Sequence, residues 1–331
     1  MKAFVTGGSG FVGHCMIEML RSRGYQVIAL ARSEQAAKRI SEMGADVVRG
    51  DLLTQAVMTE GMHNCDVVFH VAGLLSAWGS YETFYQVNVL GTECALAAAK
   101  TAKVAKFVQV GASASVMNHK PLGNADESFP LQHPAFSPYI ATKSLAEQRV
   151  IAANQSDFIT AVVRPAWIWG KGDRTISDLA QAVRANQFVW IDRGNYPYTT
   201  THVANVCHGA ILAAEHSSGG QAYFLADDDV VNFREWVTTL LQIEGVQLGN
   251  RSVSYRWAWN VAGIAETYWK MTRRQNAPPL TRTMVRLLGQ ELRFSDRKAR
   301  HQLGYTPIVS RVAGLAELAS SDWQLLSATF S

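Results

Sequence analysis

The sequence has few cysteines, and they are not arranged to bind a metal or to build a disulfide framework. Its four cysteines are Cys15, Cys65, Cys94 and Cys207, and no pair has the Cys-x-x-Cys spacing. Thiols scattered in this way argue against a zinc site and against the disulfide scaffold of a small secreted domain. A reducing compartment is therefore expected, and no metal is expected.

Other features are also missing, and each absence excludes a class of protein. The formal net charge of the 331 residues is only +4, and no block of lysine or arginine occurs, so nucleic acid is not an expected partner. No apolar run is long enough to span a bilayer, and a predicted strand at residue 2 leaves no room for a signal peptide. With 48% hydrophobic and 18% charged residues, the chain is predicted to be globular and cytoplasmic.

The first part of the chain predicts a strand, a glycine loop and a helix, in that order. Residues 2–6 have the composition of a buried strand, and apolar residues after the loop recur at helical spacing as far as Gly24. Gly7, Gly10 and Gly13 would allow a tight turn and let backbone N–H groups approach a pyrophosphate. Three glycines can also mark an ordinary turn, but their place between two strands and a helix favours a dinucleotide site.

The end of the second predicted strand, residues 25–31, indicates which dinucleotide is bound. Arg32 stands at about the distance from the glycine loop where the fingerprint has the residue that contacts the adenosine ribose. An acidic side chain would accept hydrogen bonds from a ribose 2′-hydroxyl, whereas a guanidinium suits a 2′-phosphate. No acid lies between Gly24 and Glu34. The sequence therefore predicts NADP(H) in preference to NAD(H).

Strands and helices alternate through the first half of the chain, which predicts a doubly wound parallel sheet. Ligands of such sheets bind beyond the carboxyl ends of the strands. Asp51 stands at one of these ends, where it would either contact an adenine amino group or cap the next helix. The small Ala72, at another, would let a ribose lie against the backbone. Further strands are predicted at residues 45–51, 66–73, 106–113 and 158–164.

A tyrosine and a lysine suggest acid–base chemistry. A helix predicted to start at the Ser-Pro pair 137–138 places Tyr139 and Lys143 one turn apart on one face. A neighbouring ammonium and a cationic nicotinamide would lower the pKa of the phenol and make it a usable acid or base. The same pair also occurs on ordinary surface helices. Together with the glycine loop and with Ser113 at a strand end, it predicts an active site.

These segments, with several others, resemble one known family. In chain order they are Thr6 to Gly13, Gly50-Asp51-Leu52, His70-Val71-Ala72-Gly73, Asn88 with Gly91-Thr92, Ser113, Tyr139-x-x-x-Lys143, Arg164-Pro165, residues 201–206 and residues 294–307. The set resembles an extended short-chain dehydrogenase/reductase over the whole chain. The Pro-Pro-Leu-Thr-Arg segment 278–282 and the Trp-Gly-Ser-Tyr loop 78–81 narrow the resemblance to the 3β-hydroxysteroid dehydrogenase/isomerase branch. That branch contains sterol dehydrogenases and bacterial reductases of long-chain 2-alkyl-3-oxo acids.

The resemblance implies an oxidoreductase that interconverts a secondary alcohol and a ketone with NADP(H). Tyr139 would exchange the proton, Ser113 would bind the carbonyl oxygen, and Lys143 would lower the pKa of Tyr139 and hold the nicotinamide ribose. The implied cofactor contacts are Gly7, Gly10, Phe11, Val12, Gly13, Arg32, Asp51, Leu52, Ala72, Lys143 and Pro165.

The resemblance also implies how the chain is organised. The NADP-binding Rossmann domain is expected at residues 1–165, with contributions from about 201–240. A smaller substrate lobe is expected at residues 166–200 and 241–331. A homodimer is expected, because helices 93–102 and 138–154 resemble those that form a four-helix dimer contact in this family.

Aromatic residues near the predicted nicotinamide site suggest a large apolar substrate. Trp167 and Trp169 replace the valine and tyrosine that are commoner in the family, and Trp78 and Tyr81 follow another strand end. These four are the predicted substrate contacts. A nucleotide-sugar epimerase or dehydratase would want polar sugar contacts, and an NADP-sensing regulator would commonly lose the Tyr–Lys pair. A reductase or dehydrogenase of a sterol-like or long-chain 3-oxo substrate is therefore favoured.

Residues 255–271 predict an amphipathic helix with a broad aromatic face. That face would carry Trp257, Val261, Ile264, Ala265, Tyr268 and Trp269. It is expected to pack on the substrate lobe, with two alternatives: that it lines a substrate channel, or that it lies weakly on a membrane surface. Arg273 and Arg274 favour the membrane alternative over the channel.

Overall fold

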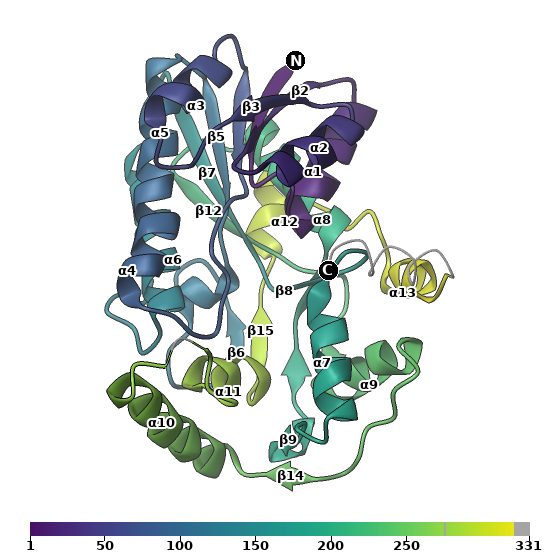
Figure 1. Ribbon diagram of the computed structural model, residues 1–331. Helices are drawn as coiled ribbons and strands as arrows, with labels where there is room; N and C mark the ends of the chain where they lie inside the picture. Colours follow the sequence, from purple (N-terminus) through teal and green to yellow (C-terminus); the bar gives the residue numbers. More distant parts are fainter. Residues whose placement is uncertain (275, 321–331) are drawn as a thin grey trace.

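The computed structural model describes residues 1–274 and 276–320 and contains a seven-stranded sheet in which every strand pair is parallel (Figure 1). The strand order is β3-β2-β1-β4-β5-β7-β12, so the chain reverses direction across the sheet between β1 and β4. The predicted doubly wound parallel sheet is confirmed. Its strands are β1 Lys2–Thr6, β2 Gln26–Ala31, β3 Asp46–Arg49, β4 Val67–His70, β5 Lys106–Val110, β7 Ile159–Pro165 and β12 Gln221–Leu225.

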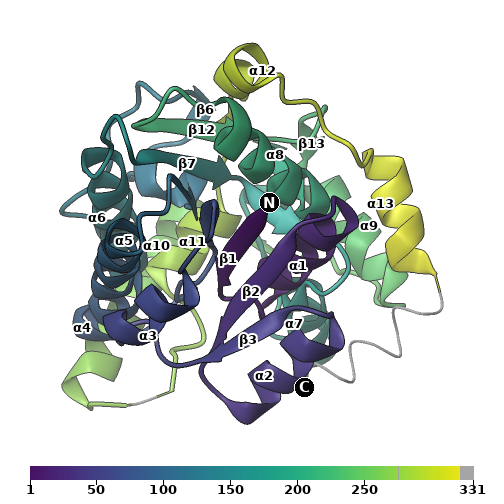
Figure 2. The same cartoon turned by 90° about the horizontal axis from the view of Figure 1, so that it is seen from above.

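Helices cover both faces of this sheet, as the view from above shows (Figure 2). Apolar side chains of both helical layers and of the strands between them form two continuous buried clusters. This double burial explains why the strands are apolar along their whole length. One face carries α1 Phe11–Ser22, α2 Glu34–Glu42, α8 Val203–His216 and α12 Arg297–Leu303; the other carries α3 Gln55–Gly61, α5 Gly91–Thr101 and α6 Pro138–Ala152.

Helix ends mostly follow the local chemistry of the sequence, and the start of α6 is one exception. Gly24 follows α1 with a left-handed φ of +81°, as expected of a residue that ends a helix. Pro138 is the first residue of α6, and Ser137 occupies the N-cap position. The Ser137 hydroxyl does not cap α6, however, because it accepts a hydrogen bond from the Thr283 hydroxyl at 2.9 Å. The exception ties α6 to the second half of the chain.

The second half of the chain builds a smaller lobe below the carboxyl ends of the strands (Figure 1). It has its own apolar core, rich in tryptophan and phenylalanine. A four-stranded sheet has the order β13-β10-β15-β6, with β6 Leu122–Ala125, β10 Pro197–Tyr198, β13 Val231–Asn232 and β15 Leu292–Phe294. Two further parallel pairs join β8 Trp167–Trp169 to β11 Thr200–His202, and β9 Trp190–Ile191 to β14 Ser252–Val253.

The remaining helices lie around this lobe or lead into α5. A short helix and a π-helical turn precede α5, and 3₁₀ turns follow β5 and β9. Their bounds are α4 Tyr81–Phe84, the π-helix Tyr85–Leu90, the 3₁₀ turns Ser113–Val116 and Asp192–Gly194, α7 Arg174–Arg184, α9 Phe233–Ile243, α10 Tyr255–Met271, α11 Arg282–Leu288 and α13 Arg311–Ala319.

The domain boundaries differ from the expected ones in two places. The β6 strand, expected in the Rossmann domain, pairs with β15 in the sheet of the lobe. Conversely, Ala299, Leu303 and Tyr305, expected in the lobe, are buried in the core between the large sheet and α1 and α8. Both differences come from long-range pairing. The expected lobe also included residues 275 and 321–331, which lie outside the described residues.

The α10 helix has the predicted bounds, but its predicted packing face is wrong. Trp257, Ile264 and Tyr268 are exposed, while the small Ala258 and Gly263 are buried. The small residues face inward because the segment around Arg282 approaches the helix closely: a β-carbon at Gly263 would lie only 2.2 Å from the Arg282 guanidinium. The small residues allow contact that the aromatic ones would block.

Candidate active site

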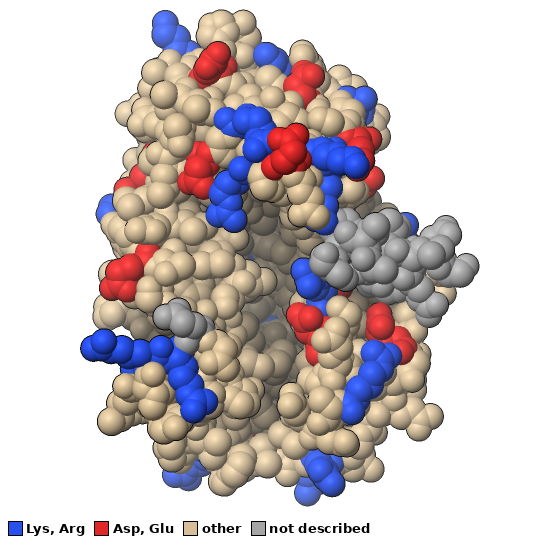
Figure 3. All heavy atoms as spheres, viewed as in Figure 1, with Lys and Arg blue, Asp and Glu red and all other residues tan. Residues whose placement is uncertain are grey.

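A cleft of about 740 Å³ runs between the carboxyl ends of the large sheet and the lobe. Figure 3 shows it as a hollow down the middle of the molecule, walled mostly by uncharged residues. It is long enough to be lined both by the glycine loop after β1 and by the last strand of the lobe, β15. The cleft brings together every predicted cofactor contact: Gly7, Gly10, Phe11, Val12, Gly13, Arg32, Asp51, Leu52, Ala72, Lys143 and Pro165.

The glycine loop has the geometry of a dinucleotide cradle. Gly7 has a φ of +73°, and a β-carbon there would lie 2.7 Å from the backbone nitrogen of Ala72. A β-carbon at Gly13 would lie 2.0 Å from the carbonyl oxygen of Gly7. Side chains are thus excluded at both positions, and the backbone stays open to a ligand beside the N-terminus of α1. The residues fit the pyrophosphate of NAD(P).

Hydrogen bonds between neighbouring strand ends hold this cradle. The Thr6 hydroxyl lies 2.9 Å from Nδ1 of His70 and accepts a hydrogen bond from the backbone N–H of Ala72. Nε2 of His70 lies 3.0 Å from the hydroxyl of Thr92 on α5. Burial lowers the pKa of His70 to about 3, so its ring stays neutral in this apolar interior. His70 therefore positions the loop as a neutral hydrogen-bonding group.

The two readings left open for Asp51 can now be separated. The N-cap residue of α3 is Thr54, so Asp51 does not cap that helix. One carboxylate oxygen of Asp51 accepts a hydrogen bond from the N–H of Leu53 at 3.0 Å, and the residue lines the cleft. The carboxylate closes a local turn at the edge of the cleft, and its contact with the cofactor stays a prediction.

Ser113, Tyr139 and Lys143 all line the cleft, and each is 8% exposed. Ser113 begins the 3₁₀ turn after β5, while α6 supplies Tyr139 and Lys143. The Lys143 ammonium donates a hydrogen bond to the carbonyl oxygen of Val110 at 3.3 Å. Three chemical groups of the predicted catalytic set therefore reach one cavity from two elements.

The expectation that Lys143 lowers the pKa of Tyr139 is wrong for the protein alone. Burial raises the pKa of Tyr139 above its usual value, and no neighbouring charge opposes this among the described residues. Burial also lowers the pKa of Lys143 to about 8, with Glu147 acting in the opposite direction. Tyr139 is therefore a neutral phenol at neutral pH, which is the form that can donate a proton.

A buried ion pair lies directly behind the catalytic residues. Nε of Arg164 donates to a carboxylate oxygen of Glu147 at 2.9 Å, and the side chains are only 3% and 1% exposed. Glu147 also accepts a hydrogen bond from the Ser115 hydroxyl at 3.1 Å. The carboxylate thus joins α6, the turn that carries Ser113, and the end of β7 next to Pro165. Sequence reasoning missed it, because the partners are far apart in the chain.

The substrate end of the cleft is apolar, but only one of the four predicted contacts lies there. Trp167 lines the cleft and packs against Tyr198 and Phe233. The other walls are hydrophobic residues that the sequence did not single out: Leu74, Leu75, Met117, Tyr198, Leu287, Leu288, Leu292 and Phe294. Most come from the lobe, whose sheet the sequence did not predict.

None of the other three predicted substrate contacts lines the cleft. Trp169 is fully buried, its indole N–H donates to Asp227 at 2.7 Å, and its ring packs against Trp236. In a regular strand, residues two apart share a face, so strand alternation does not explain why Trp167 lines the cleft and Trp169 does not. Trp78 and Tyr81 lie outside the residues that line the cleft, and Tyr81 stacks on Tyr85 instead.

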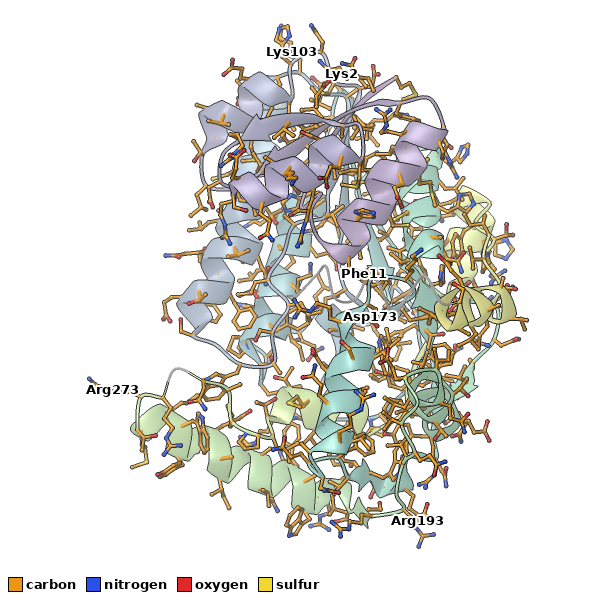
Figure 4. All side chains as sticks on the ribbon, turned by 45° about the vertical axis from the view of Figure 1, so that its right-hand side comes forward. Lys2, Phe11, Lys103, Asp173, Arg193 and Arg273 are labelled. Carbon is orange, nitrogen blue, oxygen red and sulfur yellow. The ribbon has the colours of Figure 1, made fainter. Side chains whose placement is uncertain are left out.

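Asp173 is a site residue that the sequence analysis missed. It is the N-cap of α7, where one carboxylate oxygen accepts a hydrogen bond from the N–H of Thr175 at 2.9 Å. Its second oxygen is buried, and the residue lines the cleft. Figure 4 shows it close to Phe11 of the glycine loop. An aspartate after a Gly-x-Gly turn at a strand end was the available signal.

Burial of Asp173 predicts a pH-dependent cost in stability. Burial raises its pKa to about 6, so the folded protein holds a proton that the unfolded chain has released, and stability falls as pH rises towards 6. Asp173→Asn keeps the capping oxygen and removes this cost. We expect it to raise the free energy of unfolding by about 1–3 kcal/mol at pH near 8 and by less near 5.

Urea unfolding of Asp173→Asn at the two pH values measures this effect. The exposed Asp157→Asn is the matched control and should change stability little at either pH. An equal effect of Asp173→Asn at both pH values would show that the carboxyl does not titrate as described.

Comparison with known proteins agrees with this site. The sequence profile of the 3-beta hydroxysteroid dehydrogenase/isomerase family matches residues 4–255. A 4-hydroxy-2-methyl-3-oxo-4-farnesyl-3,4-dihydroquinoline-1-oxide ketoreductase of Stigmatella aurantiaca is 42% identical over 96% of both chains. A 2-alkyl-3-oxoalkanoate reductase of Stenotrophomonas maltophilia is 33% identical over 97% of this chain and 99% of the relative.

Solved structures show the same fold. The crystal structure of gox2253 superposes with a TM-score of 0.77 at 26% identity, covering 95% of this chain and 97% of the other. A dTDP-glucose 4,6-dehydratase from Streptomyces venezuelae with bound NAD superposes with a TM-score of 0.76 at 20% identity, covering 100% and 98%. The second likeness concerns the fold alone.

The family match and the relatives show an NAD(P)-dependent oxidoreductase that acts on CH–OH groups, built on the extended short-chain dehydrogenase/reductase fold. Within that class, the chain belongs to the 3β-hydroxysteroid dehydrogenase/isomerase family.

Proposed function

We propose that this protein is an NADP-dependent ketoreductase of a large, uncharged, apolar substrate. The observation that carries the proposal is the apolar wall of the cleft beyond Tyr139, formed by Trp167, Leu287, Leu288 and Leu292. Hydrophobic walls with a few polar groups at one end are typical of pockets for apolar small molecules.

The residues have separate roles in this reaction. The nicotinamide supplies the hydride when bound. Tyr139 donates its proton to the carbonyl oxygen, and Ser113 donates a hydrogen bond to the same oxygen. Lys143, with a pKa near 8, contributes positive charge to this part of the cleft and would hold the ribose.

We infer that NADP(H) is preferred because Arg32 lines the cleft at the end of β2, while the nearby Arg49 is paired with Glu34. Arg32→Asp is expected to weaken binding of NADPH relative to NADH by about 10- to 100-fold, the value of one or two charge-assisted hydrogen bonds. Fluorescence titration with each nucleotide measures this ratio. Arg49→Asp makes the same charge change outside the cleft and should leave the ratio unchanged.

The charges of the cleft favour an uncharged ketone over an oxo acid. The charged residues that line it are Arg32, Asp51, Lys143 and Asp173. Arg286 precedes the two lining leucines, but its guanidinium is fully buried and donates to the carbonyl of Asn118 at 2.7 Å. Lys143 is thus the only cation among the lining residues near the substrate end. The relative that acts on a farnesylated quinoline ketone fits this wall better than those whose names specify an alkanoate or a sterol carboxylate.

Turnover of NADPH with a graded series of ketones tests the proposal. Each added methylene should raise kcat/KM about two- to fourfold while it is buried, since each is worth up to about 0.8 kcal/mol. Matched methyl ketones should exceed 3-oxo acids of equal length. A flat series would contradict the apolar substrate, epimerisation of nucleotide sugars would favour the epimerase alternative, and no turnover with retained NADPH binding would favour the regulator.

A further inference from the structure

An uninterrupted apolar stripe runs along the outer face of α10. Trp257, Ile264, Tyr268 and Met271 are 56%, 71%, 49% and 80% exposed, and the half-buried Val261 lies between the first two. Their spacing of three or four residues places them on one side of the helix over almost its whole length. We call these five residues the α10 stripe. A monomeric protein seldom leaves so many large apolar side chains together in water.

The opposite side of α10 is fixed to the lobe, so the helix cannot roll over to bury the stripe. Ala258, Ala262 and Gly263 are buried against neighbouring elements. Trp259 packs edge-on against Phe136, with ring centroids 5.4 Å apart. The exposed position of the stripe is therefore a fixed property of the fold.

Positive charge surrounds the stripe. Arg256 and Lys270 lie on α10, and Arg273 and Arg274 follow its end. Figure 4 shows Arg273 projecting from the outer edge of the molecule. Glu266 is the only acid on α10, and it accepts a hydrogen bond from the backbone N–H of Arg282 at 2.8 Å. The outward charge on this helix is thus almost entirely positive.

We propose that the α10 stripe docks the protein onto a membrane surface that contains anionic lipid. An amphipathic helix with tryptophan, tyrosine and aliphatic residues on one face and basic residues beside them suits the boundary between headgroups and acyl chains. Its cations complement the negative surface of such a membrane. No helix of the described residues is long and apolar enough to cross a membrane, so the proposed attachment is to the surface.

The position of α10 suggests what docking would achieve. The helix packs on α11, whose last residues Leu287 and Leu288 line the substrate end of the cleft. Figure 1 shows α10 along the end of the molecule on the side of α11. Docking would hold the apolar end of the cleft near lipid, where an apolar ketone is dissolved. This consequence rests on the proposed function, but the docking itself does not.

Flotation of the purified full-length protein with lipid vesicles tests the proposal. Vesicles of phosphatidylcholine with phosphatidylglycerol should bind the protein at low salt, and vesicles of phosphatidylcholine alone should bind it much less. The double variant Ile264→Glu and Met271→Glu should lose binding. Each of Lys270→Gln and Arg273→Gln should weaken it about fivefold, the value of one cation near an anionic surface.

The matched control is the double variant Ile308→Glu and Val312→Glu. These apolar residues are 50% and 80% exposed but lie away from α10, so their replacement makes the same charge change and should leave vesicle binding unaltered. Equal binding by both double variants would overturn the proposal, as would failure of the wild-type protein to bind anionic vesicles.

Two further measurements separate the alternatives. If sedimentation without lipid shows that the stripe variant dissociates an oligomer, the stripe is an interface between copies and the membrane proposal fails. Turnover of a water-soluble ketone without vesicles should be equal in all variants. Its absence in the wild-type protein would contradict the proposed function, while vesicle binding would still decide the docking.

Discussion

Tyr139→Phe is expected to lower kcat by about 10³-fold, within the range of contributions from a positioned acid or base. The substitution removes the hydroxyl that donates the proton to the carbonyl oxygen in the proposed reaction. The ring should keep its place, because it packs edge-on against Phe84 with centroids 6.3 Å apart and is almost fully buried. Binding of NADPH and the free energy of unfolding should therefore change little.

Single-turnover kinetics with NADPH and an apolar ketone measure this effect. Tyr81→Phe is the matched control, because Tyr81 stacks on Tyr85 outside the cleft and its hydroxyl has no part in the reaction. Full turnover by Tyr139→Phe would remove this residue from the mechanism. A loss of NADPH binding would instead show that the ring supports the cofactor site.

Glu147→Gln is expected to lower the free energy of unfolding by about 3–5 kcal/mol, the usual cost of leaving one buried charge without its partner. The Arg164 guanidinium would remain 3% exposed, without its hydrogen-bonded carboxylate and against the ring of Phe224. Turnover should fall as well, because Glu147 joins the elements that carry Ser113, Lys143 and Pro165.

Urea unfolding measures the loss of stability. Two further variants test whether the loss comes from the unpaired buried charge or from packing. Glu93→Gln breaks the exposed pair with Arg149 and should cost less than about 1 kcal/mol. The double variant Glu147→Leu and Arg164→Met removes both buried charges and should recover much of the stability, because no unpaired charge remains. A double variant no better than Glu147→Gln would show that packing, and not the charge, is responsible.

Most of the proposed catalytic centre could be predicted from the sequence, because the patterns that indicate it are local. The turn of Gly7 to Gly13 depends on a few consecutive residues, and the strands on either side are apolar because both faces are buried. Tyr139 and Lys143 share a face because four residues make about one helical turn. Each of these features can be predicted from neighbouring residues, without knowing how the rest of the chain folds.

The residues that form the walls of the substrate end could not be predicted from the sequence in the same way. Leu292 and Phe294 reach the cleft because β15 pairs with β6 and β10 from distant parts of the chain. Trp169 is large and apolar, as a substrate contact would be, but its indole N–H donates a hydrogen bond to Asp227 in the interior. A tryptophan near a strand end predicts an apolar surface there. It does not predict whether that surface lines a cavity or is packed in the interior.

The sequence by itself determined the doubly wound sheet, the glycine cradle and the spacing of the catalytic pair, because short-range periodicity and backbone sterics specify them. Only the tertiary structure decided which surfaces are covered. It paired Glu147 with Arg164, buried the Asp173 carboxylate at the start of α7, and turned the small residues of α10 inward so that Trp257, Ile264 and Tyr268 face water. Such choices depend on the closest approach of distant segments, and a helix presents the same pattern of side chains whichever face its neighbours cover.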